Sequence, residues 1–473
     1  MSKINIKSFI GDKAFYKYVL GLAIPMIIQN FITMFVQMLD NLMVGSVGTA
    51  EMSGVSVANQ LLFVVNLAIF GMVSGAGIFG AQYAGNNDPK GLRNAFRIKL
   101  ILGFVLTFAF CWVFAVNSKF FIGLFLTGDG DPQLVADTLY FAKRYIIIML
   151  VGLYPYAFSQ AYASTLRETG ETKVPMIASF AAVLFNLVFD YVLIFGKFGA
   201  PKLGVDGAAI ATVGARFLEL IILIAWTNKH KTEGLFAFAK KAYKIWKIPK
   251  DLLKDVAIKG TPLMLNEFLW ASGITRLAQL YSQRGIDVVP AQSISNTYFN
   301  LFSVIFISMG GAIGIIIGQK LGAGELDEVM GVSKKLVALS FILSIFTGLI
   351  FIGFSFVIPL LYNTTPEIRH LATIFMIIAA TGMPGDALCN GTYFTIRSGG
   401  KTFITFLMDS GFVWIACVVT ATLLIKFTSL NIFFVYFIIQ ILNYIKGLIG
   451  VILVKKKIWI NNIIDDKEVT LES

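Results

Sequence analysis

The feature that most constrains this chain is an internal duplication carried by long apolar segments. Residues 71–85 (GMVSGAGIFGAQYAG) align with residues 308–322 (SMGGAIGIIIGQKLG), and the alignment contains five identities. The same offset of 237 places Pro25 opposite Pro262 and Asn59 opposite Asn296. A duplicated set of membrane helices is typical of proteins in which two lobes move around a site between them. The duplication therefore predicts two related lobes and favours a transporter.

The composition agrees with a membrane protein. Apolar residues make up 57% of the chain and charged residues 14%, against roughly 25% charged residues in soluble domains. A helix needs about 20 apolar residues to span a bilayer. Twelve such stretches start near Tyr18, Ser53, Asn94, Leu139, Lys173, Val205, Val256, Pro290, Val332, Ile368, Thr402 and Leu430. They predict an all-α membrane protein with twelve transmembrane helices in two pseudo-symmetric six-helix bundles.

The charge distribution indicates topology and argues against a nucleic-acid partner. The net charge is +12, and most Lys and Arg residues fall in the termini and in every second loop. Such a bias places those segments in the cytoplasm. We therefore expect a multi-pass protein of the cytoplasmic membrane with both termini inside, membrane lipid as its surroundings, and no nucleic acid as a partner.

The expected domains are an N-terminal six-helix lobe (1–228), a basic cytoplasmic linker (229–251) and a C-terminal six-helix lobe with a short cytoplasmic tail (252–473). The linker, KHKTEGLFAFAKKAYKIWKIPK from Lys229 to Lys250, interleaves basic and aromatic residues. That pattern is typical of an amphipathic segment on the inner membrane surface. A simple tether is the favoured interpretation, and a regulatory or lipid-sensing role stays open.

Acidic residues inside the spans are the main functional candidates, because an unpaired charge in the membrane is costly. The duplication offers a test: an acid needed only for packing should tend to recur in the other half. Four acids fail to recur, since Leu277, Thr420, Asn30 and Tyr156 occupy the positions equivalent to Asp40, Asp190, Glu267 and Asp386, respectively. Function or divergence of a relaxed copy explains this asymmetry.

Two groups emerge from the depths of these acids. Asn186 and Asp190 share one helix face because they are four residues apart, and with Asp40 and Thr212 they fall in the outer half of the first lobe. Two carboxylates with an amide and a hydroxyl suit either a shared proton or an oxygen cage for Na⁺. Glu267 and Asp386 reach mid-membrane depth in the second lobe, where they suit a cationic substrate or a coupling cation, Na⁺ included.

Other positions are weaker candidates. Glu219 follows Arg216 by three residues, and we expect local neutralisation between them. Asp409 is left undecided. Pro25 removes a backbone hydrogen bond inside the first span, so a static kink and a hinge that answers to the charge on Asp40 are equally favoured. Close glycines such as Gly310, Gly314 and Gly318 favour tight helix packing.

Together these residues resemble the multidrug and toxic compound extrusion (MATE) family of antiporters. The resemblance extends from about Ala14 to Val454. It rests on Pro25, on QMLDN at 37–41 through Gly45, on GAQ at 80–82 through Gly85, on RETGETKVP at 167–175, on Asn186 to Asp190, on GAAIAT at 207–212, on GTP at 260–262 through Glu267, and on Asp386 to Arg397.

The resemblance implies two six-helix bundles around a central cavity and export of organic cations, often drugs, driven by inward H⁺ or Na⁺. It implies cation coupling through Asp40, Asn186, Asp190 and Thr212, with Pro25 as the kink, or through Glu267 and Asp386. This chain carries both sets of residues, so the coupling lobe and the ion stay open.

Two other functions remain as alternatives. A flippase for a lipid-linked or polyprenyl-phosphate precursor would need buried cations to bind phosphate, and only Arg276 is a fair candidate for one. A passive channel would need no ion coupling. No nucleophile–base pair or metal-ligand spacing points to an enzyme, a cofactor or a resident metal. We expect a monomer, because two lobes already enclose one site.

Overall fold

The structure is a computed structural model that describes residues 6–126, 131–244 and 248–464. The predicted linker is therefore described except at 245–247. The last part of the predicted cytoplasmic tail, residues 465–473, lies outside the described residues.

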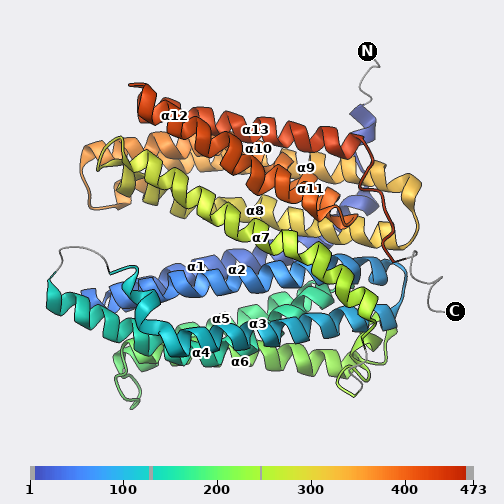
Figure 1. Ribbon diagram of the computed structural model, residues 1–473, viewed down its shortest axis with the longest axis horizontal. Helices are drawn as coiled ribbons and strands as arrows, with labels where there is room; N and C mark the ends of the chain where they lie inside the picture. The colour runs from blue at the N-terminus through green and yellow to red at the C-terminus, as the bar shows by residue number, and fades with distance from the viewer. Residues whose placement is uncertain (1–5, 127–130, 245–247, 465–473) are drawn as a thin grey trace. The chain divides into compact units, whose positions relative to one another are not determined.

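The described part of the chain forms twelve long helical segments (Figure 1). They are α1 (Lys13–Gly45), α2 (Thr49–Gly85), α3 (Pro89–Gly123), α4 (Pro132–Glu168), α5 (Lys173–Phe195), α6 (Val205–His230), α7 (Lys250–Ser282), α8 (Val288–Gly322), α9 (Leu326–Ser355), α10 (Pro366–Ser398), a composite segment, and α13 (Ile432–Lys455). The composite segment joins α11 (Thr402–Phe406), the π-helical turns η4 (Leu407–Gly411) and η5 (Val413–Val418), and α12 (Val419–Phe427).

These segments confirm the prediction of twelve spans. Eleven of the predicted starts lie within a helix, and Leu430 lies just before α13. Ten of the segments, all except α4 and α7, are long and apolar enough on their own to cross a membrane. Short 3₁₀ turns occur at η1 (Ile6–Phe9), η2 (Gly234–Ala239) and η3 (Ile358–Leu361).

Local sequence explains where several helices begin. Proline is favoured at the first helical position, where its missing N–H costs nothing, and a preceding Asp, Thr or Asn can cap the free N–H groups. The Asp88 carboxylate accepts hydrogen bonds from the N–H groups of Lys90 and Gly91, and Thr365 caps Ile368. The helices that begin with proline are α3, α4 and α10.

The helices form two compact units, which are described separately. One consists of Ile28–Gly80 and Asn87–Ala257, and we call it unit N. The other consists of Met1–Ile27, Ala81–Asn86 and Ile258–Ser473, and we call it unit C. The division falls inside α1, α2 and α7. The domain boundaries at 228 and 252 remain predictions.

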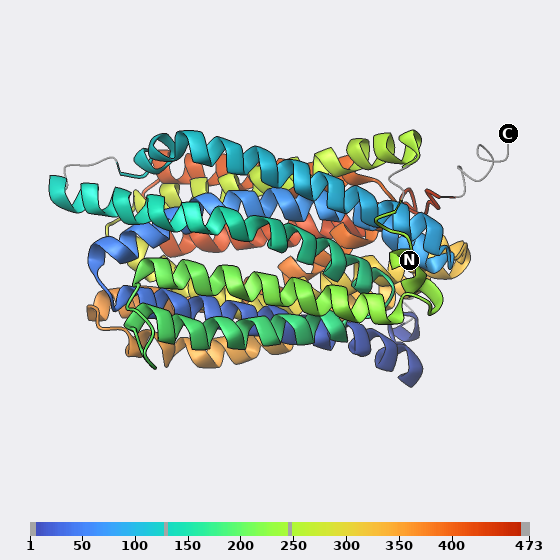
Figure 2. The same ribbon diagram turned by 90° about the horizontal axis from the view of Figure 1, so that it is seen from below.

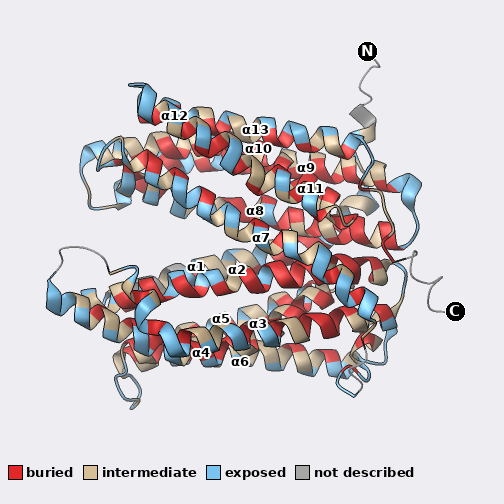
Figure 3. Ribbon diagram, viewed as in Figure 1, coloured by how far each residue is buried: buried red, intermediate tan, exposed pale blue. Residues whose placement is uncertain are grey.

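Each unit has its own set of packed helices. In unit N, α6 packs against α4 and α5, and α3 runs alongside α4 (Figure 2). In unit C, α10 packs against α8, α9 and α13. Buried residues follow the faces where these helices meet, and exposed residues cover the others (Figure 3). Many exposed side chains are large and apolar, such as Trp112 at 63% and Ile415 at 75% exposure, as expected where lipid is the solvent.

Within unit C, the ends of α2 and α8 cross through residues that the duplication relates. A Cβ on Gly85 would lie 1.9 Å from the carbonyl oxygen of Gln319, and a Cβ on Gly322 would lie 1.9 Å from that of Gln82. The two contacts are equivalent, because the offset of 237 pairs Gly85 with Gly322 and Gln82 with Gln319. Glycine is therefore required on both sides of this crossing.

Gly322→Ala is expected to lower the free energy of unfolding by roughly 1–3 kcal/mol, the usual cost of overpacking. The added methyl group meets backbone, which cannot move aside as a side chain can. Thermal unfolding of the purified protein in detergent measures the effect. Gly331→Ala is the control, because a Cβ there meets nothing within 4 Å. Equal melting temperatures for the two variants would contradict the close crossing.

Candidate functional site

A tight α5–α6 hairpin positions most of the first acid group. α5 ends at Phe195, and the next residue, Gly196, adopts a left-handed conformation with φ of 66°. The chain then returns so that the Leu203 N–H donates to the Leu193 carbonyl at 2.8 Å. A Cβ on Gly207 would lie 2.7 Å from the same carbonyl, so glycine lets α6 start directly against the end of α5. The hairpin fixes the register between the two helices.

This register brings Asn186, Asp190 and Thr212 together, and Asp40 joins them from α1. The Asn186 amide donates to the Thr212 hydroxyl at 3.3 Å, and Thr212 donates to the Ala208 carbonyl at 3.0 Å. The Asp190 carboxyl group interacts with the carboxyl group of Asp40 and with the Asn186 amide. All four residues predicted for the first lobe therefore lie in one cluster of unit N.

The two carboxyl groups lack sufficient protein partners for two negative charges. Asp190 is 1% exposed, and Asp40 is half-buried. One oxygen of each, Oδ1, is buried without a hydrogen-bond partner. Two adjacent carboxylates cannot both stay ionised at low dielectric unless a cation lies between them, and a shared proton is the other solution. The oxygens of Asn186 and Thr212 complete a donor set that fits either a proton or Na⁺.

A second layer of side chains surrounds this cluster, and sequence reasoning missed it. The buried Tyr145 on α4 interacts electrostatically with Asp40, Asp190 and Arg216. Arg216 donates to the Gly152 carbonyl at 3.3 Å, and its guanidinium lies 4.9 Å from the centre of a tyrosine ring, Tyr156. A tyrosine in an apolar span carries no sequence signal that separates this role from packing.

Arg216 and Glu219 interact electrostatically, as expected, but they do not form a direct ion pair. Among the described residues, no ion pair joins them within 4.0 Å. Arg216 contacts the Gly152 carbonyl and the Tyr156 ring on α4. Glu219 accepts a hydrogen bond from Ser179 at 2.6 Å. Ser179 in turn accepts one from Gln29 at 2.9 Å.

The second acid group lies around an ion pair in unit C. Asp409, which the sequence left undecided, is paired with Lys446 of α13 and accepts a hydrogen bond from Asn266 at 2.9 Å. Glu267 interacts with Asp409, and Asp386 interacts with both members of the ion pair. The structure therefore places Glu267 and Asp386 in one polar cluster, where both interact electrostatically with the Asp409–Lys446 ion pair.

Asp409 occupies an irregular part of its helix. It lies in the π-helical turn η4, directly after α11. π-helical turns are rare and occur frequently at functional sites, because they widen the helix and redirect side chains. Here the turn lets the Ser410 hydroxyl and N–H both bond to Asn266, which ties the composite helix to α7.

The duplication relates this cluster to the Gln29–Ser179–Glu219 chain of unit N. The offset of 237 pairs Gln29 with Asn266, and the later offset of 230 pairs Ser179 with Asp409. Glu219 and Lys446 lie equally far from the starts of α6 and α13. Each unit thus contains a side-chain amide bonded to a polar group that is itself bonded to a charged side chain. In unit N the order is Gln29, Ser179 and Glu219, and in unit C it is Asn266, Asp409 and Lys446. Sequence reasoning missed the equivalence of the two chains of hydrogen bonds, because Ser179 and Glu219 in unit N stand where Asp409 and Lys446 stand in unit C.

Buried cations lie elsewhere than expected. Arg276 is exposed and donates a hydrogen bond to Gln279 on the same helix. The expectation of a buried cation at Arg276 is therefore wrong. Lys446 is buried in the unit C cluster, and Lys99 is buried in unit N. Both are paired with carboxylates.

The Lys99 ion pair depends on two glycines. Lys99 Nζ lies 2.6 and 2.7 Å from the two carboxylate oxygens of Glu168 and donates to two hydroxyl groups at 3.0 Å. A Cβ on Gly80 would lie 1.9 Å from a Glu168 oxygen, and one on Gly77 would lie 2.9 Å away. The glycines of α2 therefore make space for a buried carboxylate, a reason that the repeat alone did not indicate.

Pro25 is buried within α1, whose helical backbone runs from Lys13 to Gly45. α1 leaves unit C at Ile27, next to the turn that holds Pro25. Its role as a hinge stays a prediction.

Comparison with known proteins identifies the family. The family model MatE matches residues 25–192 and 262–409, once in each half of the duplication. The chain belongs to the MatE family. The resemblance noted from the sequence motifs is thereby confirmed, and the protein is a multi-pass membrane protein of this transporter family.

Relatives cover most of the chain. The probable multidrug resistance protein NorM of Thermotoga maritima is 25% identical over 88% of this chain and 87% of its own length. The multidrug resistance protein MdtK of Yersinia enterocolitica is 28% identical over 78% of this chain and 79% of its own. A solved outward-facing structure of a multidrug resistance MATE family transporter is 17% identical, with a TM-score of 0.85 over 97% of this chain and 98% of that one. This last likeness supports the twelve-helix fold.

Proposed function

We propose that this MatE protein exports organic cations across the cytoplasmic membrane in exchange for H⁺ or Na⁺, by alternating access and as a monomer with both termini in the cytoplasm. The observation that carries the proposal is the Asp40–Asp190 pair, in which one oxygen of each carboxyl group is buried and lacks a hydrogen-bond partner. The names of the relatives, multidrug resistance proteins, support a drug-like cargo.

The Asp40–Asp190 pair has the chemistry of a coupling site. Loading the pair with a proton or Na⁺ relieves the repulsion between two buried carboxylates. An ion shifts a conformational equilibrium only by its difference in affinity for the two states. A pair that is solvated in one state and desolvated in the other provides that difference. Pro25, two residues before the last α1 residue that belongs to unit C, is the proposed hinge.

The unit C cluster has the chemistry of a cargo site. Lys446 neutralises Asp409, and Arg397 interacts electrostatically with Glu267. With Asp386, three acids therefore face two cations, and one negative charge is in excess. An organic cation placed beside them would balance that charge. We therefore assign ion coupling to Asp40, Asn186, Asp190 and Thr212, and cation recognition to Glu267 and Asp386.

Transport in liposomes tests the proposal. The purified protein is reconstituted, and efflux of a fluorescent organic cation is followed under an imposed H⁺ gradient, an imposed Na⁺ gradient, or neither. Acceleration by one gradient, lost when an ionophore dissipates it, is the expected result and names the ion. Transport that ignores both gradients would overturn antiport and favour a channel or a flippase.

Glu267→Gln is expected to raise the apparent KM for a monovalent organic cation several-fold while leaving the response to the gradient intact. Removing one negative charge from the cluster weakens its attraction to the cation. The control is Glu367→Gln, which neutralises an exposed acid at the start of α10. Loss of gradient dependence in Glu267→Gln with an unchanged KM would move coupling to unit C.

A further inference from the structure

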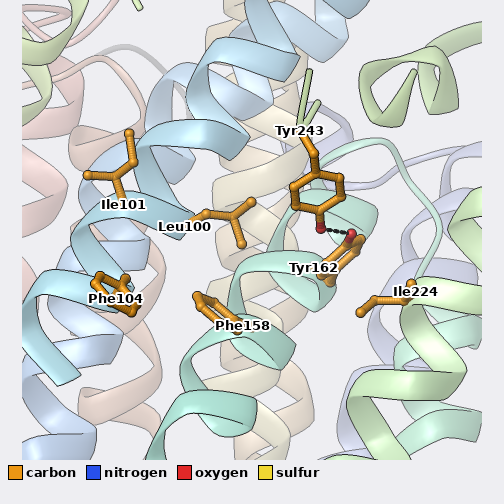
Figure 4. A pocket seen from close by; sticks show the side chains of 7 residues that line it. All are labelled: Leu100, Ile101, Phe104, Phe158, Tyr162, Ile224 and Tyr243. Atoms are coloured by element: carbon orange, nitrogen blue, oxygen red, sulfur yellow. Dashed lines mark hydrogen bonds between the residues drawn. The ribbon is translucent and has the colours of Figure 1, made fainter. Parts of the chain in front are cut away.

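A cavity separate from both acid clusters lies in unit N. It occupies about 610 Å³ between α3, α4, α6 and the segment that follows η2. Ligand pockets generally span about 300–1,000 Å³. Its walls are almost entirely apolar, and Figure 4 shows them converging on one space from all four segments. They include Leu100, Phe104, Phe158, Tyr162, Ile224 and Tyr243.

The segment that carries Tyr243 is held firmly over this cavity. Arg93 donates to the carbonyls of Ala237 and Phe238 at 3.0 and 3.1 Å. Arg97, one turn further along α3, donates to the carbonyls of Lys241 and Ala242 at 2.7 and 2.9 Å. Two arginines therefore bind four backbone carbonyls of the linker. Such an anchored segment is more than a loose tether between the two halves of the chain.

Aromatic contacts complete the cover. Phe238 is fully buried, and Phe96 packs edge-on against both Phe238 and Tyr162. The hydroxyl groups of Tyr162 and Tyr243 bond to each other, as the dashed line in Figure 4 marks. Because this bond engages both hydroxyls, the rings present apolar faces to the cavity. The cavity therefore suits a hydrocarbon chain better than a polar or charged molecule.

The same segment provides positive charge beside the cavity. Lys240, Lys241 and Lys244 lie within three residues of Tyr243 and are exposed. Lysines on the cytoplasmic surface attract anionic lipid headgroups. An apolar cavity next to exposed lysines matches an amphiphile with a hydrocarbon chain and an anionic head.

We propose that this cavity binds one acyl chain of an anionic phospholipid, whose headgroup lies among Lys240, Lys241 and Lys244. The assignment of this lipid to the inner leaflet rests on the proposed topology, but the binding itself does not depend on transport. The bound chain packs under Tyr243 and stabilises the docked linker. This assigns the linker a lipid-binding role in addition to joining the two lobes.

Native mass spectrometry of the full-length protein in mild detergent tests the proposal. Phosphatidylglycerol or phosphatidylcholine is added back after delipidation. Wild type is expected to retain one lipid and to prefer phosphatidylglycerol at least several-fold. Ile224→Trp, which fills the cavity, is expected to lose most of the bound lipid. Ile221→Trp is the matched control, because Ile221 lies one turn away on α6, is 59% exposed and is not part of the cavity wall.

A double variant separates the contribution of the lipid headgroup to binding from that of the acyl chain. Lys240→Gln with Lys244→Gln is expected to abolish the preference for phosphatidylglycerol while a lipid is still retained. Equal lipid retention by Ile224→Trp and Ile221→Trp would overturn the proposal. Stoichiometric displacement of the lipid by a transported organic cation would also overturn it, because the cavity would then belong to the cargo pathway. Since retention is measured without a gradient, failure here is distinct from failure of antiport.

Discussion

Asp190→Asn is expected to reduce gradient-driven transport to the leak rate of protein-free liposomes. The substitution leaves one carboxylate in the cluster, so binding a proton or Na⁺ no longer relieves repulsion between two buried charges. The new amide can donate to the unpartnered Oδ1 of Asp40, so the fold should be kept. Efflux of the fluorescent cation under each gradient is the measurement, together with the melting temperature in detergent.

Asp40→Asn should give the same loss of gradient-driven transport, since either carboxyl group alone is insufficient. The control is Asp251→Asn, which neutralises an exposed acid in the first turn of α7. We expect the cation to bind normally to both cluster variants, as measured by equilibrium dialysis, because the proposed cargo site is in unit C. Gradient-driven efflux at the wild-type rate in Asp190→Asn would remove the pair from the coupling mechanism.

Lys99→Met is expected to lower the free energy of unfolding by about 3–5 kcal/mol, the usual cost of removing one partner of a buried ion pair. The loss removes the ion-pair partner of the buried Glu168 carboxylate, whereas the hydrogen bond from the Ser164 hydroxyl remains. Chemical unfolding in detergent, followed by circular dichroism, measures it. Methionine is used because it keeps the volume of the lysine stem.

The double variant Lys99→Met with Glu168→Gln decides whether charge is the cause. It removes both charges, so most of the lost stability should return, because the chief penalty is an uncompensated buried charge and not the absence of the pair. If the double variant were as unstable as Lys99→Met, packing of the lysine stem and not charge would be responsible.

The sequence alone was sufficient for the fold class, and it named acids that the structure places in two clusters. A membrane-spanning helix must satisfy its own backbone hydrogen bonds, so length and apolar content define it locally. The duplication was equally visible, because glycine at Gly85 and Gly322 is required wherever two backbones approach within contact distance. The four-residue spacing of Asn186 and Asp190 placed them on one face without any knowledge of neighbours.

The interaction partners of the charged side chains could not be predicted from the sequence. Asp409 and Lys446 lie on different helices, and Lys99 and Glu168 meet only because Gly77 and Gly80 leave space between them. Arg216 bonds to a carbonyl on α4 and not to Glu219, its neighbour on the same helix. A long side chain has several possible partners within its reach.

By itself, then, the sequence determined which segments cross the membrane, that they form two related sets, and which acids lie in apolar spans, where an unpaired charge is costly. Only the tertiary structure decided which of those acids are neutralised, as Asp409 is by Lys446, and which keep an unpartnered oxygen, as Asp40 and Asp190 do. The physical reason is that helix formation depends on neighbours along the chain, whereas the balance of buried charge depends on groups that packing brings from other helices.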